Sequence, residues 1–296
     1  MRELSNQASW QAMLSEDIEL TSIEELWNMR YRIQRSAEGQ QYNEPNQDCA
    51  MIQVSGLQAA FTICDGVSLS FCGQLSAQVL AYALTNWMLK DGMSVVQSSL
   101  FNKDTINILR QAGTKLIQSV EPPASFIHEF TSHLERIREG AAEQVAEYKL
   151  PDALSPMVRD VLEEKRSKGS ECIYMSGLMH RDEHSGEVHL LLVWQGDIRA
   201  RLWIDEAEVC LRSDSQIRTE ERWSTSKGLI GDIHAQWYHL PRSCDHAVRL
   251  VLYTDGLSLL DRYEQLPDDQ EMNEIFWRSL QRPESDDMTY IEIGYS

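Results

Sequence analysis

The order of the expected secondary-structure elements predicts an α+β fold, and three observations support this prediction. Short apolar runs typical of strands come first, between residues 29 and 66. Stretches with apolar residues at helical spacing follow, and strand-like runs return after Gly169. A further helix and one more strand complete the order. Because strands and helices come in blocks, we expect sheets to form the core and helices to cover their outer faces.

The first half of the chain is expected to contain a hairpin followed by helices. A strand is expected over 29–35, and a polar loop over 36–47. The next strand turns at Ser55-Gly56 into a buried apolar strand that Gly66 ends. Apolar residues at a spacing of three and four then predict the helices. The hairpin strands are expected over 49–54 and 57–66, and the helices over 75–91, 104–120, 124–148 and 157–167.

In the second half of the chain the apolar period changes from helical to strand-like. Short runs rich in β-branched and aromatic residues are separated by turn residues, which is typical of antiparallel sheets. The strands are expected over 173–178, 188–194, 200–204, 233–240, 247–253 and 288–293, and a helix over 269–281.

The domain organisation follows from where these elements lie. Residues 1–28 are polar and acidic with scattered apolar side chains, and we expect them to form an N-terminal extension. Residues 29–296 are expected to form one domain with a helical insert at about 93–168. A chain of 296 residues with 42% hydrophobic residues can bury a substantial core.

Charge and cysteine usage exclude several function classes. The chain has 27 Lys and Arg against 46 Asp and Glu, a formal charge of −19, and no concentrated basic stripe, so we expect no nucleic-acid partner. The six cysteines form no CxxC pair, which favours a reducing cytoplasm. The first residues lack the apolar core of a signal peptide, and no apolar run is long enough to span a bilayer. We therefore expect a cytoplasmic protein with no membrane contact.

Acidic residues stand where several expected strands end. Asp65 follows a buried apolar run, and Asp255 follows another, each as the first residue of an Asp-Gly pair. Carboxylates gathered at strand ends offer the oxygen ligands that Mg²⁺ and Mn²⁺ prefer. Two such ions can polarise a phosphoryl group and activate a water molecule. The candidate acids are Asp48, Asp65, Asp197, Asp255 and one of the pair Asp286 and Asp287.

These motifs, in this order, resemble the metal-dependent serine/threonine protein phosphatases of the type 2C (PPM) family, in particular a divergent bacterial branch. The similar segments run from about residue 30 onward and are Asn46-Gln47-Asp48-Cys49-Ala50, Phe61-Thr62-Ile63-Cys64-Asp65-Gly66-Val67, Gly169-Ser170-Glu171-Cys172, Gly196-Asp197-Ile198-Arg199, Leu252-Tyr253-Thr254-Asp255-Gly256-Leu257 and Asp286-Asp287-Met288-Thr289. The resemblance implies an α-β-β-α sandwich of two antiparallel sheets, with a metal pair in a cleft at one end of the sheets.

The resemblance also implies roles for individual residues. Asp65 would bridge two Mn²⁺ or Mg²⁺ ions, and the Gly66 carbonyl would help to hold one of them. Asp255 and Asp286 would bind the other ion. Asp48 would bind a metal or orient the attacking water. Asp197 matches a position that helps some members to bind a third metal. The implied reaction is hydrolysis of phosphoserine or phosphothreonine in a protein substrate, with a serine/threonine kinase as a further partner.

The sequence departs from the family pattern at several of these motifs. Asn43 stands near the place of the arginine that clamps phosphate, and an amide cannot replace a bidentate cation. Arg30, Arg32 or Arg35 would have to reach the site from the first strand instead. Gln47 replaces a glutamate and removes one negative charge. These departures keep an alternative open, namely a weak or inactive module that binds phosphoproteins or a kinase or scaffold partner.

A second metal motif is present in the sequence, but its context speaks against it. His180-Arg181-Asp182-Glu183-His184 matches the H-x-x-E-H string of inverted zinc proteases. That chemistry needs a helix, where neighbouring side chains are three or four residues apart. The string lies between two strand-like runs, so we expect a hairpin loop. The other histidines, including His189 and His239, show no cluster spacing.

Overall fold

The computed structural model describes residues 9–24, 26–92, 118–183, 185–211, 218–240 and 246–295. The strands are β1 (Ser9–Leu14), β2 (Ile18–Glu24), β3 (Asn28–Gln34), β4 (Cys49–Ser55), β5 (Gln58–Gly66), β6 (Gln118–Val120), β7 (Glu171–Arg181), β8 (Val188–Gln195), β9 (Arg199–Ile204), β10 (Ala207–Val209), β11 (Arg222–Ser224), β12 (Gly228–Ile230), β13 (His234–Leu240), β14 (Val248–Tyr253) and β15 (Met288–Tyr295). The helices are α1 (Ala37–Tyr42), α2 (Gly73–Trp87) with a π-helical end (Met88–Gly92), α5 (Ala124–Glu147), α6 (Pro156–Lys168), the 3₁₀ helix η3 (Asp255–Arg262) and α7 (Asp269–Leu280).

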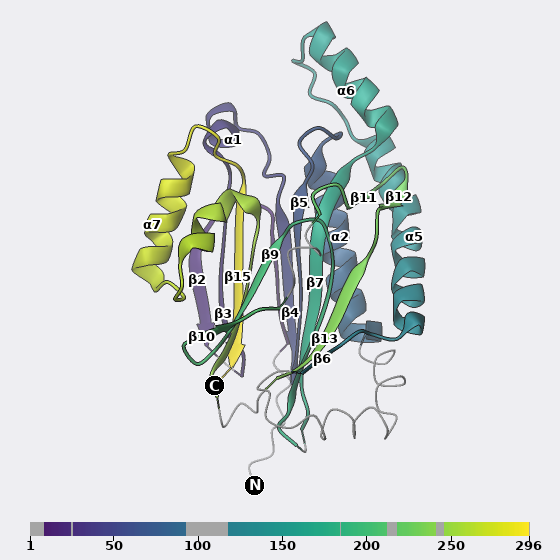
Figure 1. Ribbon diagram of the computed structural model, residues 1–296. Coiled ribbons are helices and arrows are strands. Elements are labelled where there is room, and N and C mark those ends of the chain that lie inside the picture. Colours follow the sequence, from purple (N-terminus) through teal and green to yellow (C-terminus); the bar gives the residue numbers. More distant parts are fainter. Residues whose placement is uncertain are drawn as a thin grey trace.

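The described strands form two sheets that lie face to face (Figure 1). In the nine-stranded sheet the order is β1-β4-β5-β7-β8-β13-β6, and β11 and β12 are attached to β7. In the six-stranded sheet it is β10-β9-β14-β15-β3-β2. Neighbouring strands in both sheets are antiparallel. The predicted α+β sandwich of two antiparallel sheets is confirmed.

Side chains alternate along each strand and fill three layers. The inward faces of the two sheets share one core, in which Phe61, Ile63 and Leu252 are buried. Helices α2 and α5 pack on the outer face of the nine-stranded sheet, and α7 and η3 cover the outer face of the six-stranded sheet (Figure 1). Each large apolar side chain buried in this way stabilises the fold by about 1.5–3 kcal/mol.

Most elements match the sequence prediction, and the differences concern short segments. The β4–β5 hairpin, α2, α5, α6, α7 and the strands after Gly169 are confirmed. The loop expected over 36–47 contains the short helix α1, which Ser36 caps at its start. The helix expected over 104–120 is wrong at its end, because residues 118–120 form β6, which pairs with β13. Residues 104–117 lie outside the described residues.

The first described residues belong to both sheets. Strand β1 pairs with β4 in the nine-stranded sheet, and β2 pairs with β3 in the six-stranded sheet. The segment expected to be an N-terminal extension therefore contributes strands at the edges of both sheets, and alternation in its short apolar runs was too weak to predict them. The division into an extension and one domain with an insert stays a prediction. In the described part of the chain, no helix combines the length and apolarity that crossing a bilayer requires.

Candidate functional site

Strand alternation places two of the predicted acids between the sheets, at the end of the sandwich where β5 finishes. Phe61 and Ile63 of β5 point into the core between the sheets, and Asp65 continues this side of the strand. Ala50 and Ile52 of β4 point the same way, and Asp48 directly precedes this strand. Asp48 and Asp65 therefore project toward the six-stranded sheet.

Asp48 ties the two sheets together through hydrogen bonds. Its Oδ2 accepts from Thr254 Oγ1 at 2.8 Å and from Thr289 Oγ1 at 2.9 Å, and both threonines belong to the six-stranded sheet side. The Thr289 backbone N–H donates to Thr254 Oγ1 at 3.0 Å. Asp48 is only 1% exposed. Sequence reasoning gave neither threonine a role, although each is next to or near a predicted acid in its motif.

Asp65 lies among four other carboxylates. Burial raises its pKa well above the usual range, and the charges of Asp48, Asp255, Asp286 and Asp197 raise it further, in that order. Each of these side chains therefore acts on the same carboxyl group from a different part of the chain. The structure therefore places the other four acids predicted from the sequence within electrostatic range of Asp65.

The pair Asp286 and Asp287 divides into two different environments. Asp287 is buried, and its carboxylate accepts from the backbone N–H groups of Ser36 at 2.8 Å and Gln47 at 2.6 Å. These bonds hold the loop that carries Asp48. Asp286 is exposed, and its charge acts on Asp48, Asp65 and Asp255. Asp286, the residue predicted from the sequence, accepts from the Asp287 backbone N–H through Oδ1 at 2.8 Å, and its exposed carboxylate is accessible to a ligand.

Two glycines allow helix α2 to begin close to the end of β5. A Cβ added to Gly66 would lie 2.6 Å from the carbonyl carbon of Gly73, and one added to Gly73 would lie 2.8 Å from that of Gly66. A Cβ on Gly66 would also lie 2.7 Å from the Gln47 carbonyl oxygen. The segment carrying Asp65 is thus packed against both α2 and the loop before Asp48.

Arg199 is a cation at the edge of this acidic group. It starts β9, and its Nη1 donates to the Asp197 carbonyl at 3.0 Å and lies 3.3 Å from Asp197 Oδ2. Its positive charge lowers the pKa of Asp255, which burial and the charges of Asp286 and Asp197 raise. Arg199 belongs to the segment Gly196-Asp197-Ile198-Arg199, and the sequence alone does not predict a role for it.

The arginines expected to reach in from the first strand have other partners. Arg30 binds Glu292 and Asp269, and Arg32 donates to Asn273 and lies 4.3 Å from the centre of the Phe276 ring. Both are therefore on the outer face beside α7. Arg35 pairs with Asp17 and donates to Asn43 Oδ1 at 3.4 Å.

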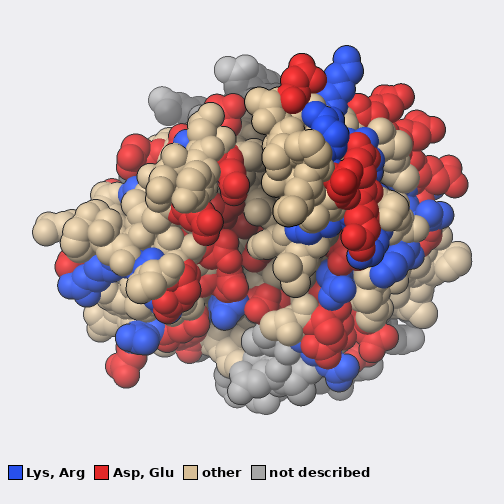
Figure 2. All heavy atoms as spheres, turned by 90° about the horizontal axis from the view of Figure 1, so that it is seen from above, with Lys and Arg blue, Asp and Glu red and all other residues tan. Residues whose placement is uncertain are grey.

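The donor set of this group fits hard divalent cations. Carboxylates and a carbonyl supply only oxygen ligands, as Mg²⁺ and Mn²⁺ prefer, and the mutual repulsion that raises the pKa values would be offset by positive charge. Among the described residues, no three of these acids have carboxylate oxygens that all lie within 4.8 Å of one another, so the carboxylates do not form a closed ligand set by themselves. Figure 2, seen onto the end where β5 finishes, shows acidic side chains gathered along a hollow.

The overall fold is similar to that of several solved phosphatases. A bacterial serine phosphatase matches at a TM-score of 0.51 with 13% identity, over 90% of this chain and 97% of that chain. RsbX in complex with magnesium matches at 0.50 with 12% identity, over 94% and 100%. The serine/threonine phosphatase Stp1 from Staphylococcus aureus matches at 0.50 with 14% identity, over 96% and 99%.

Sequence comparison alone does not reveal this similarity. No protein-family model matches the chain, and no curated protein matches its sequence. At such low identity the structural match shows the fold, which is the one that the sequence resemblance implied.

Proposed function

We propose that this chain, which has the fold of the type 2C phosphatases, is a metal-dependent phosphatase that hydrolyses phosphoserine and phosphothreonine in proteins. The observation that supports this most is the convergence of four carboxylates around Asp65 at the end of the sandwich. The fold is shared with phosphatases whose own function is dephosphorylation at serine or threonine.

The acids would divide the work of binding two Mn²⁺ or Mg²⁺ ions. Asp65 would bridge the pair, helped by the Gly66 carbonyl, while Asp255 and Asp286 would hold the ion nearer the six-stranded sheet. Asp197 would be available to a third ion. When bound, such ions supply Lewis-acid polarisation of the phosphoryl group and lower the pKa of water.

Two further side chains would act directly on the reactants. Asp48 has one carboxylate oxygen occupied by the two threonines, so its other oxygen can orient the attacking water. Arg199 would bind a phosphoryl oxygen through its positive charge, which the uncharged Asn43 cannot supply. Arg199 also lines a cavity of about 460 Å³ with Arg201, Glu208, Tyr253 and Asp261, which would receive residues that flank the phosphorylated side chain.

The cellular setting belongs to the same proposal. Cys49, Cys64 and Cys172 are buried free thiols, which suits a reducing compartment, and we place the reaction in the cytoplasm. A phosphorylated protein would be the substrate, and the serine/threonine kinase that phosphorylates it would be a partner acting in the opposite direction.

The test is hydrolysis of a phosphoserine peptide and an aryl phosphate by the full chain with Mn²⁺, Mg²⁺ or chelator. We expect turnover with either metal, none with chelator, and a loss of at least about 10²-fold in Asp65→Asn. The exposed variant Asp152→Asn is the matched control. Metal-independent turnover would contradict the proposal.

The alternative function is a module that binds phosphoproteins or a kinase or scaffold partner without turnover. It is favoured by Asn43 and Gln47, which stand where the type 2C phosphatase family pattern has an arginine and a glutamate. Binding of the phosphopeptide by calorimetry, together with no turnover in Mn²⁺ or Mg²⁺, would select this alternative and overturn the catalytic proposal.

A further inference from the structure

A group of histidines lies at the end of the nine-stranded sheet opposite the acidic cleft. His189 of β8 pairs in register with His180 of β7 on one side and with His239 of β13 on the other. Directly paired residues of neighbouring strands point to the same face of the sheet. The register from Asp65 down to this row spans seven residues of β5, or about 23 Å at about 3.3 Å per residue.

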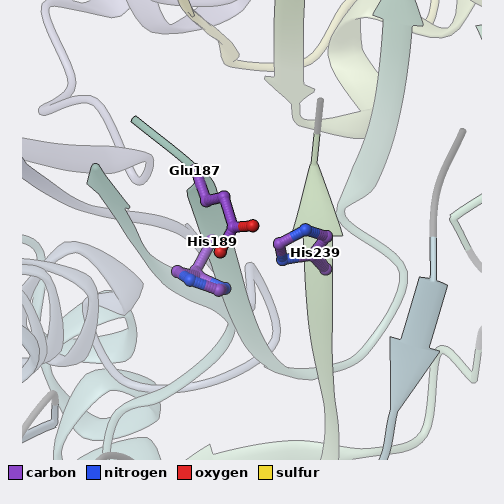
Figure 3. A group of neighbouring side chains, drawn as sticks. All are labelled: Glu187, His189 and His239. Atoms are coloured by element: carbon purple, nitrogen blue, oxygen red, sulfur yellow. The ribbon is translucent and has the colours of Figure 1, made fainter. Parts of the chain in front are cut away.

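Glu187 completes this group from the turn before β8. Glu187, His189 and His239 each have a possible ligand atom within 4.8 Å of those of the other two. Among the described residues, no other three His, Cys, Asp or Glu side chains come this close together. Figure 3 shows the Glu187 carboxylate directed toward both rings.

The surroundings hold His189 in place. Its ring stacks on Trp237 at a centroid distance of 5.3 Å and lies 5.0 Å from the ring of His239. The Nδ1 atoms of His189 and His180 are buried and have no hydrogen-bond partner among the described residues. A buried ring nitrogen without a partner is costly unless a proton donor or a metal ion meets it.

We infer that Glu187, His189 and His239 form a second metal centre, which binds a transition ion such as Zn²⁺. Two imidazoles and one carboxylate are a ligand set of catalytic zinc sites, whereas Mg²⁺ prefers oxygen ligands alone. Ligands of a tetrahedral zinc site are about 3.3 Å apart for bonds of about 2.0 Å, so small side-chain rotations close the site. His180, next in the row, is the candidate for the fourth ligand.

This centre differs from the protease motif in the sequence. The H-x-x-E-H string forms the end of β7 and the turn after it, as expected, and His184 lies outside the described residues. Only His180 of that string belongs to the row. His189 and His239 lie in strands, as expected, and their spacing in the sequence gives no sign of the cluster because strand pairing joins residues 50 positions apart. The inference does not depend on the proposed phosphatase activity.

The test is titration of the full chain with Co²⁺ and Zn²⁺ in the Asp65→Asn background with excess Mg²⁺, which keeps the acidic cleft from contributing. We expect one ion per chain and the visible absorption of Co²⁺ with nitrogen ligands. His189→Ala and His239→Ala should weaken binding by about 100-fold or more, and His180→Ala by about tenfold. The exposed His128→Ala, on α5, should change nothing.

Glu187→Gln keeps the size of the side chain and tests the site even where a histidine variant fails to fold. It should weaken Zn²⁺ binding by about tenfold with an unchanged circular dichroism spectrum. Absence of Co²⁺ binding in the Asp65→Asn chain, or equal affinity in the histidine variants and His128→Ala, would overturn the inference.

Discussion

At the residue scale, the surroundings of Asp65 disfavour a negative charge on its carboxyl group. Its pKa is raised first by burial and then by four neighbouring carboxylates. The same arrangement that destabilises the metal-free fold creates affinity for a divalent ion, since positive charge offsets the repulsion. Residues of a site commonly carry such a cost for stability.

Replacing Asp65 with asparagine should therefore separate stability from metal binding. Without metal, Asp65→Asn should raise the free energy of unfolding by about 1 kcal/mol, or roughly 2–4 °C in Tm, because it removes the repelled charge. The stabilisation that Mn²⁺ gives the wild type should disappear. Thermal unfolding with and without Mn²⁺ measures both effects, with Asp152→Asn as control; a lower Tm and a retained Mn²⁺ effect would contradict this.

Arg199 should act on phosphate and metal in opposite directions. Arg199→Ala should raise KM for a phosphoserine peptide by about tenfold, because a charged hydrogen bond to phosphate is lost. Mn²⁺ affinity should stay equal or rise, since a positive charge near Asp255 is removed. Kinetics and calorimetry of the same preparation test this, with the exposed Arg278→Ala as control. An unchanged KM would rule out a phosphate-binding role.

At the element scale, the start of α2 determines where Asp65 lies. The close approach of Gly66 and Gly73 lets the helix begin directly behind the end of β5. Any side chain at this contact must move either the helix or the strand end, since backbone atoms are in the way. The position of the acid therefore depends on the packing of a helix and not only on its own strand.

Gly73→Ala should accordingly impair both stability and the site. The added Cβ meets backbone atoms of Gly66 at 2.8 Å, so we expect a loss of about 1–3 kcal/mol and weaker Mn²⁺ binding. Gly140→Ala in α5, with no atom within 4 Å of the new Cβ, should instead stabilise by about 0.5–1 kcal/mol. Denaturant unfolding compares the two. Equal behaviour would show that α2 does not depend on this contact.

At the scale of the whole molecule, the cleft is the place where the two sheets meet through polar contacts. Asp48 comes from one sheet, and Thr254 and Thr289 come from the other. Below this level the sheets contact each other through apolar side chains. The chain as a whole has a net charge of −19, in addition to the acids gathered in the cleft. The metal-free molecule therefore has repulsion between negative charges both in the cleft and over its surface.

The stability of the metal-free chain should therefore fall as pH rises above about 3.9, the ordinary pKa of an aspartic acid side chain. Burial and mutual repulsion raise the pKa values of Asp48 and Asp65, and the charges of the exposed Asp255 and Asp286 contribute to this repulsion, so the folded state binds protons more tightly than the unfolded state. The stability this contributes is present at low pH and is lost as pH rises through the raised values. Denaturant unfolding across this range measures the slope.

Two comparisons make the pH experiment specific to the cleft. In Asp65→Asn the slope should be smaller, because one of the repelled groups no longer titrates. The gain in Tm from Mn²⁺ should grow with pH, since metal ligands must lose their protons first. A slope equal in wild type and Asp65→Asn would assign the pH dependence to the surface charge.

The fold was predictable from local patterns wherever an element was long and regular. The hairpin before Asp65, helices α2 and α5 and the strands after Gly169 follow from apolar period and turn residues. Short strands such as β1 and β6 were not predictable, because each pairs with a strand that is distant in sequence.

The sequence by itself determined which acids stand at strand ends, because strand periodicity and Asp-Gly turns are local properties. Only the tertiary structure decided that these acids surround Asp65, that Thr254 and Thr289 hold Asp48, and that Arg199 lies beside Asp255. It alone also placed His189 beside His239. The physical reason is that strand register and sheet packing bring distant residues together, and no local spacing records this.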